Sequence, residues 1–154
     1  MKYSCIIILL LLTSTAQASY CSGKNWQDAY QFYTDNIDVL NVHIDRYNKL
    51  LNQTNTTESN HDQQQQYVRV AYAIAELDKL STDVEELGRK FVRIKGLWQL
   101  ISEHCLNDDE LDYNNKAIEN IRGANIGRKE VNDLLARIES LRLYFFQVVE
   151  RNNY

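Results

Sequence analysis

Apolar residues recur along most of the chain at alternating spacings of three and four, which place them on one face of an α-helix. The first series predicts a helix from Trp26 to Leu51, with a buried face made of Trp26, Tyr30, Tyr33, Ile37, Leu40, Ile44, Tyr47 and Leu51. A longer series is made of Tyr67, Val70, Ile74, Leu77, Leu80, Val84, Leu87, Phe91, Ile94, Trp98, Ile101 and Cys105. We expect the rest of the chain to pack against this longer series.

The long central stretch is expected to bend or break. As one straight helix of roughly forty residues it would extend about 60 Å, against about 40 Å for the first helix. In this assignment the spacing slips between Leu77 and Leu87, Thr82-x-x-Glu85 matches a capping box, and Gly88 and Gly96 lower the helix propensity. Two helices, about 63–80 and 83–105, are therefore favoured over a single kinked helix.

The last third of the chain predicts a short helix and a long one. The acidic residues of the segment 107–110, which begins with Asn107, suit the first turn of a short helix that carries Leu111, Ile118 and Ile121 and stops at Gly123. A final helix starts near Asn125 and carries Val131, Leu134, Ile138, Leu141, Phe145 and Val148. Without proline or an alternating strand pattern, the chain predicts an all-α, single-domain antiparallel helical bundle.

The amino terminus has the three parts of a secretory signal peptide. Lys2 is followed by an apolar run, 6–12, and by small residues at Ala16 and Ala18, which predicts cleavage after Ala18. The signal would be 1–18 and the helical domain 19–154, secreted and extracellular. No later segment is apolar enough to insert into a membrane.

Charge argues against nucleic acid as a partner. Removing the signal takes away Lys2, one of 17 basic residues, and none of the 21 acidic ones, so the net charge moves from −4 to −5. An acidic chain without a basic patch suits neither nucleic acid nor an anionic membrane surface.

The cysteines predict one disulfide. Cys5 is lost with the signal, and in an oxidising compartment the remaining pair, Cys21 and Cys105, is expected to bond. Closing so long a loop stabilises the fold by roughly 4 to 5 kcal/mol on the chain-entropy account.

Two N-glycosylation sequons begin at Asn52 and Asn55, within an entirely polar stretch, 52–66, that predicts a surface loop. Because the sequons are adjacent, steric crowding opposes the use of both at once.

Candidate chemistry is sparse. Residues 108–119 have acidic side chains at several offsets of a calcium loop, but Tyr113 occupies the place of the required glycine. His43, His61 and His104 are far apart and match no ligand spacing, and no nucleophile or phosphate-binding motif is present. We expect no metal, no cofactor and no enzymatic activity.

Aromatic residues provide the candidate binding sites. Neighbours on a helix point about 100° apart, so Tyr144, Phe145 and Phe146 cannot all enter one core. Partly exposed aromatic rings on rigid helices are common interface anchors, and we expect Phe32, Tyr144 and Phe146 to bind an extracellular protein.

Two family resemblances suggest what that protein is. The segment from Ile126 to Leu134 resembles the Ile/Val-Gln-x-Lys-Ala-x-x-Glu-Leu signature of interferon gamma, with Gly127 and Glu130 in place of glutamine and alanine. This resemblance to class II helical cytokines implies a cytokine, or a mimic of one, that binds a cell-surface receptor.

The overall plan resembles salivary proteins of blood-feeding mosquitoes of the anophensin and albicin type. The resemblance is carried by a signal peptide, Cys21 near the start, Glu103-His104-Cys105 before an acidic turn, and the tail from Glu139 to Phe146. It implies a protein that binds host plasma proteins, of the alternative complement pathway or the contact and coagulation system, without cleaving them. A secreted, non-enzymatic inhibitor of a host plasma cascade, serving haemostasis control or immune evasion, is therefore the first hypothesis, and the cytokine is the alternative.

Overall fold

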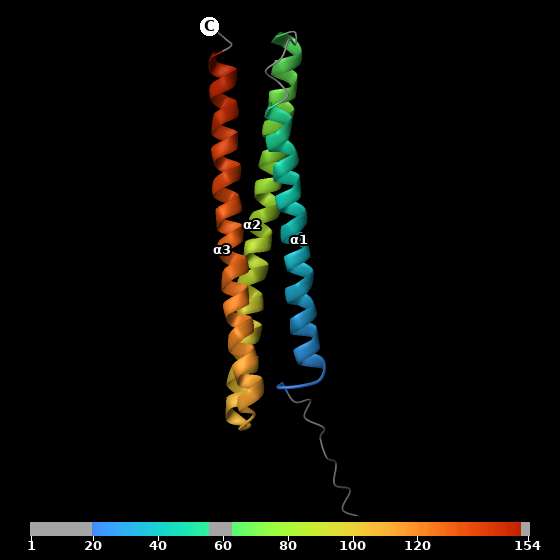
Figure 1. The fold of residues 1–154 in the computed structure, drawn as a ribbon, viewed down its shortest axis with the longest axis vertical. Helices are drawn as coiled ribbons and strands as arrows, with labels where there is room; N and C mark the ends of the chain where they lie inside the picture. The colour runs from blue at the N-terminus through green and yellow to red at the C-terminus, as the bar shows by residue number, and fades with distance from the viewer. Residues whose placement is uncertain (1–19, 56–62, 152–154) are drawn as a thin grey trace, which may run out of the picture.

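Three long helices form the fold in the computed structural model, which describes residues 20–55 and 63–151. They are α1 (Lys24–Asn55), α2 (Gln63–Asn107) and α3 (Leu111–Arg151). Figure 1 shows them side by side, with α2 antiparallel to both neighbours. α2 contacts α3 most extensively and α1 next, while α1 and α3 touch less. The predicted all-α antiparallel bundle is confirmed.

α2 is one continuous helix, so the preferred division into 63–80 and 83–105 is wrong. Its buried side chains alternate by three and four without interruption: Val70, Ala73, Leu77, Leu80, Val84, Leu87, Phe91, Ile94, Trp98, Ile101 and Cys105. The expected slip arose because Ile74 was assigned to the buried face in place of Ala73. Thr82 lies in mid-helix and donates its hydroxyl to the Asp78 carbonyl at 3.1 Å, instead of capping a new helix.

α1 buries a face rotated slightly from the predicted one. Of the predicted members, Leu40 and Tyr47 are buried, whereas Tyr30 and Leu51 are exposed. The remaining buried positions hold small or polar residues for the most part: Ala29, Asn36, His43 and Leu50. Asn36 is accommodated because its Nδ2 donates to the Phe32 carbonyl at 2.6 Å.

α3 runs through Gly123, so the predicted stop there is wrong. Leu111, one of the apolar residues assigned to the short helix, is 60% exposed, and the buried positions before Val131 are Asn114, Ala117, Ala124 and Gly127. The predicted series from Val131 to Phe145 is buried as expected.

Both glycines leave room for an aromatic ring of a neighbouring helix. A Cβ at Gly123 would lie 2.9 Å from the Tyr33 hydroxyl oxygen, and one at Gly127 only 2.3 Å from Cε1 of Phe91. Ring packing therefore offsets the propensity cost of glycine, about 1 kcal/mol per residue.

The connections between elements explain where the helices end. After α2, the Glu110 amide donates to the Cys105 carbonyl and the Asp109 amide to the Leu106 carbonyl, the pattern of a Schellman turn. Asp109 adopts the left-handed conformation that this turn requires, at φ 59°. At the start of α1, Gly23 has φ 81° and its carbonyl accepts the Gln27 amide.

The predicted surface loop is shorter than expected, because α1 continues to Asn55 and α2 starts at Gln63. Residues 52–55 and 63–66 are thus helical, and Asn52 is exposed near the end of α1. The predicted signal peptide and His61 lie outside the described residues. Within the described ranges, no helix is long and apolar enough to cross a membrane.

Candidate binding groove beside the disulfide

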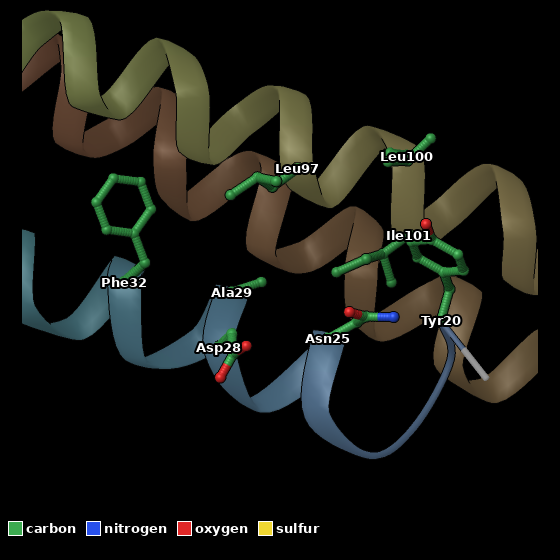
Figure 2. Close-up of a pocket in the computed structure, with 8 residues that line it drawn as sticks. All are labelled: Tyr20, Asn25, Asp28, Ala29, Phe32, Leu97, Leu100 and Ile101. Atoms are coloured by element: carbon green, nitrogen blue, oxygen red, sulfur yellow. The ribbon is translucent and has the colours of Figure 1, made fainter. Parts of the chain in front are cut away.

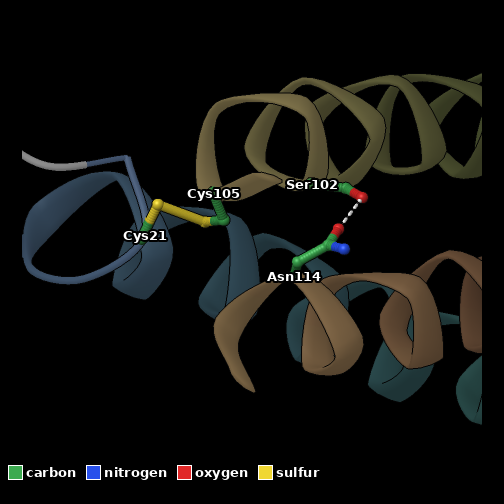
Figure 3. Close-up of a disulfide and its surroundings, with 4 residues drawn as sticks. All are labelled: Cys21, Ser102, Cys105 and Asn114. Atoms are coloured by element: carbon green, nitrogen blue, oxygen red, sulfur yellow. Dashed lines mark hydrogen bonds between the residues drawn. A yellow bond between two sulfur atoms is a disulfide. The ribbon is translucent and has the colours of Figure 1, made fainter. Parts of the chain in front are cut away.

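The disulfide joins the segment before α1 to the last turn of α2. Cys21 and Cys105 are bonded with their Cα atoms 5.2 Å apart, across 84 residues of sequence, which confirms the predicted pairing (Figure 3). Both cysteines are fully buried. The bond therefore fixes the amino end of α1 against the carboxyl end of α2.

Aromatic and polar contacts surround this covalent link. Tyr20 stacks on His104, with ring centroids 4.2 Å apart and planes within 9° of parallel. Trp26 packs in edge-to-face geometry with Trp98 and with Tyr113, at ring-centroid distances of 4.9 Å and 5.6 Å, so one ring of α1 contacts both other helices.

A hydrogen bond joins α2 and α3 at the same end. The Ser102 hydroxyl donates to Oδ1 of Asn114 at 2.5 Å, as Figure 3 shows. Covalent, aromatic and polar links therefore hold all three helices together near the disulfide.

An open groove of about 390 Å³ lies between α1 and α2 beside this link. Figure 2 shows its lining, made of Tyr20, Asn25, Asp28, Ala29, Phe32, Leu97, Leu100 and Ile101. Leu97 and Leu100 are 41% and 42% exposed, although both are large aliphatic residues on a rigid helix. The groove combines an apolar floor with polar groups, Asn25 and Asp28, at its α1 edge.

The sequence-predicted binding residues fall on two separate surfaces. Phe32 lines the groove and is half-buried. Tyr144 and Phe146 are 49% and 43% exposed near the far end of α3, on either side of the buried Phe145. Tyr33, the neighbour of Phe32 on α1, packs against Gly123 of α3. Tyr144 lies 21 residues beyond Gly123, so the two surfaces are about 30 Å apart along the bundle axis.

Sequence reasoning missed Tyr20, Leu97 and Leu100 as groove residues. Leu97 and Leu100 flank the buried Trp98 and Ile101 by one position each. The extra leucines widen the apolar face of this helix beyond the buried stripe, and this width could have predicted a partly exposed apolar surface here. The contribution of Tyr20 depends on the fold, because the disulfide brings it to α2.

His43 is a buried titratable side chain of α1, and it is not among the residues that line the groove. Its Nδ1 has no hydrogen-bond partner, and burial lowers the pKa of His43, helped by the positive charges of Arg46 and Lys90 and opposed by Asp83. Nearby, Arg46 donates to Asp83 at 2.8 Å. This hydrogen bond is the main cause that lowers the pKa of Asp83.

The described residues contain no group of three or more histidine, cysteine, aspartate or glutamate side chains placed to hold a metal ion. Comparison of the chain with known protein families, with curated proteins and with solved structures gives no match. The function is therefore inferred from the geometry of the groove and from the sequence.

Proposed function

We propose that the protein acts by binding another protein without chemical catalysis, as a secreted inhibitor that occupies a surface of a host plasma protein. The observation that carries the proposal is the open apolar groove, where Leu97 and Leu100 stay more than two-fifths exposed. Apolar surface kept in water at a concave site is typical of a binding surface.

The rigidity of the groove supports the proposal. Both walls are long helices, and the disulfide with the stack of Tyr20 on His104 closes one end. A preformed groove loses little conformational entropy when a partner binds, so more of the contact free energy remains as affinity. Such a site is suited to blocking a partner by occupancy.

The plasma cascade is proposed from the resemblance to mosquito salivary proteins, and the test is functional. Recombinant protein beginning at Ser19 is added to human plasma, and lysis by the alternative complement pathway and contact activation are measured. We expect dose-dependent inhibition of one cascade, lost when the disulfide is reduced. No inhibition of either cascade at micromolar concentration would contradict the proposal.

A cytokine-like function is the second candidate, and one observation favours it. In the interferon-gamma-like segment of α3, Ile126 is 63% exposed, and Lys129 and Glu130 are exposed as well. Of the remaining signature positions, Asp133 is exposed as well, whereas Gly127 and Leu134 are buried and serve packing. Receptor-dependent signalling by cells treated with the protein, together with inactivity in plasma, would favour this candidate.

The aromatic pair at the far end of α3 gives a separate prediction. Replacing Tyr144 and Phe146 with alanine is expected to weaken target binding, by less than a substitution in the groove, because neither ring is part of the groove lining. Surface plasmon resonance with the identified plasma target measures the effect, and circular dichroism controls for folding. Unchanged affinity, or loss of helicity, would remove the pair from the interface.

A further inference from the structure

The apolar floor of the groove continues along α1 beyond the lining residues. Phe32 and Val39 are one heptad apart, about 10.5 Å along the axis, and therefore lie on the same flank of α1. Val39 is 38% exposed. A partner could therefore contact α1 at two apolar positions, Phe32 and Val39. On the α2 side of the groove, the lining includes Leu97 and Leu100.

The two rims of the groove carry opposite charges. Asp28 lines the α1 rim, and Asp35 lies one heptad further along the same flank. On α2, Arg93 precedes Leu97 by one helical turn and is exposed. Within the described ranges Asp28 and Arg93 form no ion pair, while Asp35 accepts a hydrogen bond from Gln31 at 2.6 Å.

We propose that this groove receives an amphipathic α-helix of the target protein, an inference that rests on the proposed function. The helix would place apolar residues one heptad apart on the floor, basic residues beside Asp28 and Asp35, and acidic residues beside Arg93. Helix-in-groove binding uses such anchors at i, i+3, i+4 and i+7. The complex would then have the four-helix cross-section of a common bundle.

The shape of the groove favours a helix over a small ligand. Its volume of about 390 Å³ is near the lower end of the range for enclosed ligand sites, roughly 300–1,000 Å³. It is open to solvent, because Leu97 and Leu100 of its lining stay partly exposed, and the residues that line it come mainly from two antiparallel helices, between which a further helix can pack. The opposite charges on the rims select a partner with two different flanks.

The proposal is tested with a designed peptide as the probe. A fluorescein-labelled amphipathic 21-residue peptide carries leucine at its a and d positions, lysine along one flank and glutamate along the other. Fluorescence anisotropy is expected to show saturable 1:1 binding to the protein. Leu97→Glu is expected to weaken this binding at least about tenfold, because a charge would enter the apolar floor.

A matched variant separates the groove from general surface stickiness. Val92→Glu changes a residue of α2 that is 51% exposed and outside the groove lining, and it is expected to leave peptide affinity unchanged. Circular dichroism of both variants shows whether each is folded. If Val92→Glu weakens binding as much as Leu97→Glu does, the groove is not the site.

A charge exchange tests the rims. Arg93→Glu makes both rims acidic, so it should weaken binding of the lysine/glutamate peptide several-fold and strengthen binding of a peptide with lysine on both flanks. Equal affinity of both peptides for both proteins would overturn the charge-selected helix. A dimer in multi-angle light scattering that dissociates on Leu97→Glu would identify a second copy of the chain as the occupant instead.

The plasma assay distinguishes failure of this inference from failure of the proposed function. Inhibition by the unaltered protein and equal inhibition by Leu97→Glu would overturn the groove and leave the inhibitor function intact. Peptide binding in the groove without inhibition of any cascade would overturn the function and leave the helix site intact.

Discussion

Gly127 shows how one missing side chain shapes the contact between α2 and α3. The Phe91 ring is fully buried and occupies the space where a Cβ of residue 127 would lie. Gly96, in contrast, is exposed in α2 with no atom near its would-be Cβ. Substitution by alanine is therefore expected to change the stability of the fold in opposite directions at Gly127 and Gly96.

Gly127→Ala is expected to destabilise the fold by about 1–3 kcal/mol, because Phe91 must leave its position. Gly96→Ala, the matched control, is expected to stabilise it by about 0.5–1 kcal/mol, because alanine has the higher helix propensity. Urea unfolding followed by circular dichroism measures both. Stabilisation by Gly127→Ala would show that the Phe91 ring packs well without the space left at Gly127.

His43 makes stability depend on pH. Burial holds the pKa of His43 below its ordinary value of 6.5, so below about pH 6.5 the unfolded chain binds a proton that the folded chain resists. Stability is therefore expected to fall as the pH is lowered from about 7 to 5. This range lies above the ordinary value of 3.8 for Asp83, whose carboxylate stays ionised.

Replacing His43 with leucine should flatten this dependence and raise stability near pH 5, since an apolar side chain completes the buried face. Urea midpoints of both proteins at a series of pH values give the slopes. The same slope in both would assign the pH dependence to other groups.

The residues that sequence reasoning missed share a physical cause. Large apolar side chains report burial, and they located Leu40, Tyr47 and the series from Val131 to Phe145 correctly. Buried alanine, asparagine, histidine and glycine give no such signal. On α1 the large apolar residues Tyr30, Ile37 and Ile44 each follow a buried small or polar residue, and they shifted the predicted buried face by one residue from the observed one.

At the scale of elements, helix type was predictable and helix boundaries were not. The expected breaks rested on local signals, at Thr82-Glu85, Gly88, Gly96 and Gly123, and on the slip in spacing that came from assigning Ile74 to the buried face. In the fold the uninterrupted buried face of α2 and the ring contact at Gly123 outweigh these local preferences. Tertiary packing commonly overrides propensity in this way.

α1 is expected to open before the other helices. Its buried face includes Asn36 and His43, whereas that of α2 is apolar throughout, and α1 touches α3 little. Hydrogen–deuterium exchange measured by mass spectrometry should show faster exchange for amides of α1 between Asn36 and Leu50 than for those of α2 between Leu77 and Ile101. Equal protection would indicate a single cooperative unit.

At the scale of the whole molecule, the protein is a rod with two unlike ends. α2 has 45 residues and so extends about 67 Å. The amino end of α1, with the disulfide and the groove, lies at one end, and the amino end of α2 lies at the other, as the course of the helices in Figure 1 shows. The groove itself was beyond sequence reasoning, because its walls come from segments that only the fold brings together.

Removal of the disulfide should affect both stability and the groove. Cys21→Ser with Cys105→Ser is expected to cost about 2–5 kcal/mol, because the unfolded chain regains the freedom of a loop of 84 residues. Thermal unfolding measures the loss. Peptide affinity should fall as well, since Tyr20 is then free to leave His104, and a double variant with unchanged affinity would separate the groove from the disulfide.

The packing of the Phe91 ring into the space left at Gly127 also favours one alignment of α2 and α3 along the bundle axis. A face that repeats every seven residues matches its partner equally well after a shift of one heptad, so leucine-rich helices are prone to slide. Such a shift would set Phe91 against residue 120 or 134, which are asparagine and leucine. Both have side chains where glycine leaves space for the ring, so Gly127 opposes such a shift, together with the short turn that joins α2 to α3.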